Sequence, residues 1–91
     1  MKSESFTGKV EVFPDGWVYI RVPTANSNPY LEYRKIGNIP IIAKTGNSEW
    51  STLLWAFGDG TFFITLPAKV RTKQKISAGD NITVQFKLRN K

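Results

Sequence analysis

Apolar and polar residues alternate along most of this chain, and a period of two is the pattern of β-strands that bury one face. In the last alternating stretch, polar residues separate Ile82, Val84 and Phe86, so one face belongs to a core and the other to solvent. Clusters of Gly, Pro, Asn and Asp divide the alternating stretches. The pattern predicts six strands, at about residues 6–12, 17–22, 39–45, 49–57, 61–66 and 82–88.

The stretch 49–57 is apolar on both faces, with Trp50 on one and Trp55 on the other. A strand of this kind is typical of a central position that is covered on both sides. A domain of 91 residues has little area to bury. We therefore expect Trp50, Trp55, Phe62 and Phe63 in the core, because aromatic rings bury the most area.

Two segments break the alternation and predict short helices. Pro67 opens the clearer one, roughly Ala68 to Gln74, with basic residues exposed. In the other, Asn28 suits a helix cap and Pro29 a first turn, so Pro29–Arg34 is predicted to form one or two helical turns. The polar residues 24–28 before it are predicted to form a loop.

The segment from Phe13 to Pro23 recurs from Phe57 to Pro67, with matching residues 44 positions apart (13 and 57, 15 and 59, 20 and 64, 23 and 67). Such repetition indicates one supersecondary unit present twice, in about residues 5–45 and 49–89. Barrel closure removes the exposed edges that six strands would otherwise present. We therefore predict one all-β domain over residues 1–91, with one or two short helices. Its strands form a small closed double-split β-barrel of two pseudo-symmetric halves.

The motifs of the second half resemble two families. A strand ending in Leu66-Pro67, a basic short helix and Gly79-Asp80 before a closing strand resemble half of the dimeric barrel of the AbrB/MazE-type swapped-hairpin regulators. With Trp50-Ser51-Thr52 and Gly60 added, the ordered set is more similar to DUF1905, a family of uncharacterised small proteins that looks like a duplicated, single-chain barrel. Residues 24–28 depart from that family's pattern, which more often has a compact short helix there. The resemblance implies the fold and assigns no function.

The residue inventory narrows the possible chemistry. The chain has no Cys and no His, which excludes disulfides, thiolate chemistry, cysteine zinc sites and a histidine base. Asp15, Asp59 and Asp80 lie in glycine-containing turns, where a short carboxylate usually bonds local backbone. Gly58-Asp59-Gly60 is too short to cradle a phosphate. We therefore predict no enzyme activity, no catalytic residue, no cofactor and no metal.

The first residues lack the apolar segment of a signal peptide, and no apolar run is long enough to span a bilayer. We expect a soluble, cytoplasmic protein that does not bind membranes. Because one chain supplies both halves of the barrel, we also expect a monomer.

The formal net charge of +6 either promotes binding to nucleic acid through counterion release or only keeps a small domain soluble. The candidate nucleic-acid-binding residues lie around the second predicted helix and at the end of the last strand: Lys69, Arg71, Lys73, Lys75, Lys87 and Arg89. The other interpretation is a solvated helix face and a basic tail. Nucleic-acid binding is the leading functional hypothesis, although the first copy lacks an equivalent basic segment.

Exposed aromatic residues provide an alternative hypothesis. Trp17, Tyr19 and Arg21 share one face of the second predicted strand and are candidates for a ligand or partner surface. Tyr30, Tyr33 and Trp55 could line a groove with them, although the core assignment is favoured for Trp55. This hypothesis predicts a small-ligand or protein-interaction module, and it would lose its basis if Trp17 and Tyr19 were both buried.

Overall fold

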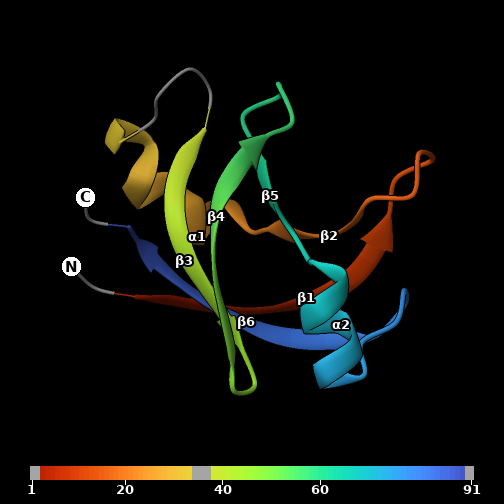
Figure 1. The fold of residues 1–91 in the computed structure, drawn as a ribbon. Coiled ribbons are helices and arrows are strands. Elements are labelled where there is room, and N and C mark those ends of the chain that lie inside the picture. The colour runs from red at the N-terminus through yellow and green to blue at the C-terminus, as the bar shows by residue number, and fades with distance from the viewer. Residues whose placement is uncertain (1–2, 34–37, 90–91) are drawn as a thin grey trace.

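The computed structural model describes residues 3–33 and 38–89, and these form a closed antiparallel β-barrel with short helices (Figure 1). The strands are β1 (Glu4–Val12), β2 (Val18–Val22), β3 (Ile39–Thr45), β4 (Ser48–Ala56), β5 (Phe62–Thr65) and β6 (Asn81–Leu88). The helices are α1 (Thr24–Ser27), the 3₁₀ helix η1 (Asn28–Tyr33) and α2 (Ala68–Gln74). No helix within these described ranges is both long enough and apolar enough to cross a membrane. The predicted fold class is confirmed.

The order of the strands around the ring shows the duplication directly. Neighbours follow the order β1-β2-β5-β4-β3-β6, and β6 pairs with β1 to close the barrel. Exchanging β1, β2 and β3 with β4, β5 and β6 reproduces the same ring. The two halves are therefore related by a pseudo-twofold axis. Below, the residue 44 positions away in the other half is called the counterpart.

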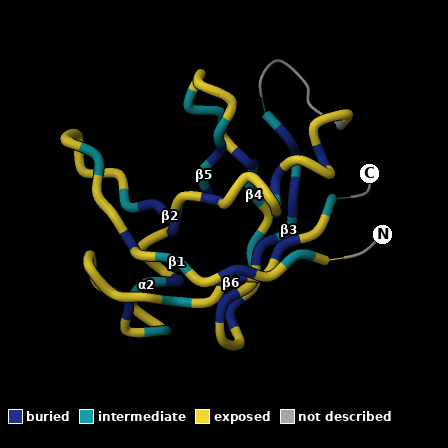
Figure 2. Tube along the Cα trace, turned by 180° about the vertical axis from the view of Figure 1, so that it is seen from behind, coloured by how far each residue is buried: buried dark blue, intermediate teal, exposed yellow. Residues whose placement is uncertain are grey.

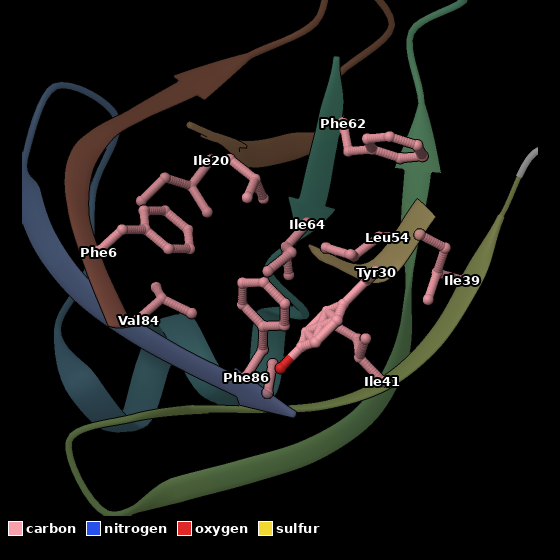
Figure 3. Close-up of a cluster of buried hydrophobic side chains, with 12 residues drawn as sticks. Phe6, Ile20, Tyr30, Ile39, Ile41, Leu54, Phe62, Ile64, Val84 and Phe86 are labelled. Carbon is pink, nitrogen blue, oxygen red and sulfur yellow. The ribbon is translucent and has the colours of Figure 1, made fainter. Parts of the chain in front are cut away.

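The axis passes between β2 and β5, where Ile20 pairs with its counterpart Ile64. Both side chains are fully buried, and they lie among the inward-facing residues of the other strands (Figure 3). Alternation places every second residue inside, so buried positions recur along the strands while the turns between them are exposed (Figure 2). The predicted strand pattern thus supplies the main core cluster.

In each hairpin the two strands separate beyond a short paired segment, and a helix bridges the gap between them. β1 and β2 pair from Val10 to Val12, and α1, which follows β2, reaches back to β1 through Asn26 Nδ2, which donates to Glu4 Oε1 at 2.9 Å. In the other half, α2 follows β5 and reaches β4 through Gln74 Nε2, which donates to Ser48 Oγ at 2.9 Å. The helices lie at opposite ends of the barrel (Figure 1).

Each end of the barrel is filled from its helical segment. Tyr30 of η1 packs edge-on against Phe86 inside the main cluster, with ring centroids 5.4 Å apart (Figure 3). Val70 of α2 joins a second cluster with Val10, Leu66 and Ile76. The helix predicted at Ala68–Gln74 is confirmed at both ends.

The loop predicted at residues 24–28 is wrong, because Thr24–Ser27 form α1. This helix starts directly after Pro23, as α2 starts directly after Pro67, so the 44-residue offset holds here too. The helix is hard to recognise in the sequence because most of its residues are short and polar. Its position is fixed by the contact of Asn26 with β1. The helical turns predicted at Pro29–Arg34 are present as η1 up to Tyr33, and Arg34 lies outside the described residues.

The expectation that β4 is buried on both faces is wrong for its outer face. Trp55 points away from the barrel and is 37 % exposed, whereas Trp50 is half-buried against both core clusters. Phe62 is buried and Phe63 half-buried, so the core assignment holds best for Phe62. Val12 alternates in phase with the buried Phe6 and Val10 of β1, but it is 46 % exposed because it ends the strand next to the turn.

Candidate binding groove

Four aromatic rings stack on the outside of the barrel around the pseudo-twofold axis. Phe13 stacks on Tyr19 with centroids 4.0 Å apart, and their counterparts Phe57 and Phe63 lie 4.6 Å apart. Edge-to-face contacts join the two pairs, with Phe13 5.1 Å from Phe63 and Tyr19 5.9 Å from Phe57. Such arrangements add to the stability gained from area alone. The cluster fixes the two turns, Phe13–Trp17 and Phe57–Thr61, beside each other.

A groove of about 510 Å³ opens beside this cluster. Its apolar walls are four aromatic side chains: Phe13, Trp17, Trp55 and Phe63. Trp17, directly before β2, is 61 % exposed, and Trp55, within β4, is 37 % exposed. The groove has the size and the aromatic lining that are typical of small-molecule sites.

Three polar residues complete the groove: Asp15, Thr52 and Thr65. Asp15 lies in the β1–β2 turn, where the backbone N–H of Trp17 donates to its Oδ1 at 3.4 Å. The turn requires a positive φ of 98° at Gly16, which glycine adopts without strain. The predicted backbone role of the turn carboxylates is confirmed here, and also at Asp80, whose Oδ2 accepts the N–H of Ser77. Asp15 nevertheless keeps a face on the groove.

The counterpart region on the other side of the axis is built differently. Arg21 extends over the ring of Phe57, with its guanidinium carbon 4.2 Å from the centroid, and its Nη1 donates to Thr61 Oγ1 at 3.3 Å. Thr61 in turn donates through its hydroxyl and its backbone N–H to Asp59. These hydrogen bonds, with a smaller contribution from the charge of Arg21, hold the pKa of Asp59 below its ordinary value.

Of the three residues predicted to form a ligand surface, only Trp17 lines the groove. Tyr19 is 6 % exposed because Phe13 covers its ring, and its hydroxyl donates to Glu11 Oε1 at 3.3 Å. Burial, and secondarily the negative charge of Glu11, raise the pKa of Tyr19 above its ordinary value. Arg21 is exposed but engaged with Phe57. Because Trp17 is exposed, the aromatic hypothesis keeps its basis.

The six candidate basic residues fall into two separate groups. Lys69, Lys73 and Lys75 are exposed around α2, whereas Arg71 is half-buried and its Nε donates to the Leu66 carbonyl at 2.9 Å. Lys87 lies six positions along β6 from Asn81, about 20 Å at the rise of a strand. Lys87 and Arg89 therefore lie toward the C-terminal end of β6, away from α2 (Figure 1).

Within residues 3–33 and 38–89, no group of three His, Cys, Asp or Glu side chains comes together in a way that could hold a metal ion. A comparison with models of protein families matches residues 6–86 to the domain of unknown function DUF1905. The chain belongs to the DUF1905 family. No curated protein matches the chain. The resemblance stated from the sequence motifs is confirmed, and the family description assigns no function to this DUF1905 domain.

Of the seven residues that line the groove in this DUF1905 domain, the predicted ligand surface contained only Trp17, and two of the others, Trp55 and Thr65, matter most for the chemistry of the groove. Trp55 was assigned to the core because β4 is apolar on both faces, and apolarity alone does not show which face is covered. Thr65 by itself carries no sequence signal of a binding residue. Its counterpart Arg21 is a clearer signal, because the 44-residue offset pairs a cation with a threonine.

Proposed function

We propose that this DUF1905 domain is a binding module rather than an enzyme, and that the groove beside the aromatic cluster is its ligand site. The observation that supports this most directly is the exposure of two tryptophans, Trp17 and Trp55, on the walls of one groove. An indole left in water forfeits a favourable burial of up to about 150–250 Å². Paired exposed indoles are therefore a costly arrangement unless a ligand covers them.

The groove also lies where the two halves of the barrel differ. Its apolar residues Trp17 and Trp55 have the polar counterparts Thr61 and Glu11. The fold does not require tryptophan at either position, since the other copy forms the equivalent turn with Thr61 and the equivalent strand pairing with Glu11. A requirement of binding explains the difference better than a requirement of folding.

A ligand-observed NMR screen with a mixed library of neutral and charged fragments tests the proposed function. We expect hits that disappear in the variant Trp17→Ala/Trp55→Ala and persist in Lys69→Ser/Lys73→Ser, which alters an equal number of exposed residues outside the groove. Hits that persist in the tryptophan variant, or the absence of any hit, would contradict the groove as the binding site.

Nucleic-acid binding remains a second candidate, supported by three exposed lysines on one short helix. In the described part of the chain, no hydrogen bond or ion pair within 4.0 Å joins Lys69, Lys73 or Lys75 to a carboxylate. Their charges are available to a polyanion. Because Lys87 and Arg89 lie far from α2, we propose a small contact of a few phosphates, not a surface formed by all six residues.

Filter binding with duplex DNA and RNA at several salt concentrations tests this second candidate. Contacts to about three phosphates predict a slope of log K against log salt of roughly −2 to −3. Lys69→Ser/Lys73→Ser should flatten that slope, and Trp17→Ala/Trp55→Ala should leave it unchanged. No binding at low salt, or a slope near zero, would refute the proposal.

A further inference from the structure

The pseudo-twofold axis relates the groove to a second site on the barrel. We call it the occupied position, because the side chain of Arg21 already fills it. The groove residues Phe13, Asp15, Trp17, Trp55 and Thr65 have as their counterparts, in turn, Phe57, Asp59, Thr61, Glu11 and Arg21. The strand registers agree with this assignment, because Arg21 pairs with Phe63 across β2 and β5 as Thr65 pairs with Tyr19. The two positions can therefore be compared side chain by side chain.

At the occupied position, a cation of the chain itself fills the space beside the aromatic ring. The Arg21 guanidinium lies over Phe57, with its carbon 4.2 Å from the centroid, and it also contacts Thr61. Its charge contributes to the low pKa of the Asp59 carboxyl, after the hydrogen bonds from Thr61. The unit thus combines an aromatic face and a turn carboxylate around one positive charge.

At the groove, the ring and the carboxylate are kept but the cation is missing. Phe13 and Asp15 occupy the places of Phe57 and Asp59, and Thr65 stands where the longer Arg21 stands in the other half. The shorter threonine leaves open the volume that a guanidinium takes across the axis. Trp17 and Trp55 then add two indole walls, and indole is the aromatic group that attracts cations most strongly.

The local charge agrees with this comparison. Among the residues that the structure describes, Asp15 is the one charged side chain on the groove walls, although the whole chain carries a formal charge of +6. Arg71 of α2 lines a neighbouring hollow, which shares Asp15 and Trp17 with the groove, and its Nε is already bonded to the Leu66 carbonyl. A positive ligand group would meet a carboxylate and aromatic faces without a competing cation on the walls.

We propose that the groove binds an organic cation, specifically a methylated ammonium group such as a trimethylammonium. A guanidinium carries five N–H donors that need acceptors, and the groove offers few beyond Asp15 and two threonine hydroxyls. A methylated ammonium needs no acceptor and presents apolar surface to the indoles, which is how aromatic cages hold quaternary ammonium ligands. This inference rests on the proposed function, since it names the ligand class of the same groove.

Isothermal titration calorimetry with choline and with 3,3-dimethylbutan-1-ol tests the charge requirement. The two probes have the same shape, but the alcohol replaces the ammonium nitrogen with carbon and is neutral. We expect choline to bind at least about tenfold more tightly than the alcohol, from the cation–π attraction together with the Asp15 charge. Asp15→Asn should weaken choline binding about threefold or more and leave the alcohol unchanged.

The variant Thr65→Arg tests the symmetry argument. It gives the groove the residue that fills the other position, so it should abolish choline binding while every aromatic wall remains. Thr72→Arg, which makes the same exchange at an exposed position of α2 outside the groove, should bind choline as the wild type does. Trp17→Leu keeps apolar bulk at an exposed position and should lower choline affinity about threefold to thirtyfold.

A third probe, Nε-trimethyllysine within a short peptide, distinguishes a free small molecule from a modified protein tail as the source of the ammonium group. Tighter binding of choline assigns the groove to free small molecules, and tighter binding of the peptide assigns it to modified protein tails; either result supports the ammonium chemistry. Equal binding of choline and the neutral alcohol would overturn the inference and leave the groove as a ligand site. Absence of choline binding, with groove-dependent hits in the fragment screen, would do the same. Absence of both would overturn the proposed function as well.

Discussion

Ile20 of β2 and Ile64 of β5 lie directly opposite each other, fully buried, at the point where the pseudo-twofold axis crosses the barrel (Figure 3). They are the same position of the repeated unit, so each packs against its own counterpart. The turns beside the axis and the strands β1 with β4 and β2 with β5 can be located from this pair by the 44-residue offset. The aromatic cluster, the two turns, the occupied Arg21 position and the groove are all related across it.

This pairing predicts that Ile20→Ala and Ile64→Ala destabilise the barrel by similar amounts, about 2–5 kcal/mol each. The reason is that each truncation leaves a cavity at the same place in the core. Urea denaturation followed by circular dichroism measures both values. Because the residues touch, the double variant should depart from additivity. A loss below about 0.5 kcal/mol for either single variant, the size of a surface effect, would refute their equivalence.

The contact of Arg21 with Phe57 predicts a measurable coupling energy. A double-mutant cycle with Arg21→Met and Phe57→Leu should give about 0.5–1 kcal/mol, the range for an exposed cation over an aromatic ring. Methionine keeps the length of the side chain and removes its charge. The same cycle between Arg21→Met and Phe13→Leu serves as the control and should give no coupling. If both cycles gave the same value, the guanidinium would not be held by the ring.

The end of α2 predicts a substitution that stabilises the protein. Lys75 adopts the left-handed conformation, with φ 55° and ψ 49°, and the N–H of Ile76 donates to the Arg71 carbonyl at 2.9 Å. Glycine takes this conformation without the steric cost of a Cβ. Lys75→Gly should therefore raise the free energy of unfolding by about 0.5–1 kcal/mol in denaturant titrations.

Lys73→Gly is the matched control for this variant, because it removes the same charge inside the helix. It should lower the free energy of unfolding by about 0.5–1 kcal/mol. Equal losses in the two glycine variants would show that Lys75 is not strained.

The hydrogen bonds of Asp59 predict the direction of its titration. Its pKa is lowered chiefly by the Thr61 hydroxyl and then by the Thr61 backbone N–H. The folded state therefore favours the ionised carboxylate, and the stabilisation is present above the unfolded-state pKa of about 3.9 and is lost as the pH falls through the lower folded-state pKa. Carboxyl ¹³C NMR should give a lower titration midpoint for Asp59 in the wild type than for Asp59 in the variant Thr61→Ala. An unchanged midpoint in that variant would contradict the assigned cause.

Closure of the ring predicts a monomer. Each described strand pairs with a neighbour on both sides, and a helix bridges the gap where the strands of each hairpin separate, so the described residues leave no whole strand edge open to a second copy. Light scattering at micromolar to millimolar concentration should give the mass of one chain, 10.3 kDa. If a dimer formed, Trp17→Ala/Trp55→Ala would show whether the exposed indoles hold it together, and a stable dimer of either kind would contradict the prediction.

The fold could be predicted from the sequence because the signals are local and repeated. Alternation identified the strands, and the recurrence of Phe, Asp, Gly and Ile at a fixed offset identified the two halves. The helix α1 was missed because three of its four residues, Thr24, Asn26 and Ser27, are polar and have weak helical preference, so its structure depends on contacts with β1. That contact joins residues more than twenty positions apart, which a local pattern does not reveal.

The groove could be predicted only in part. Trp17 was identified as a surface candidate, because it shares a strand face with the charged Arg21. Tyr19 shares that face too but is buried, since Phe13 folds back over it from the turn. Trp55 could not be placed, because both faces of β4 are apolar and the decision depends on what lies outside the barrel. The exchange of Arg21 for Thr65 is visible in the sequence, but its meaning appears only once the axis is known.

The central claim is that a ligand binds in the groove. A ¹H–¹⁵N NMR titration of the three tryptophan indoles with choline measures this binding most directly. Trp17 and Trp55 line the groove, while Trp50 is half-buried against the core and is the internal control. We expect saturable chemical-shift changes at Trp17 and Trp55 and no change at Trp50. In the variant Thr65→Arg we expect no change at any indole. Unmoved signals at Trp17 and Trp55 in the wild type, or shifts that persist in Thr65→Arg, would contradict the central claim.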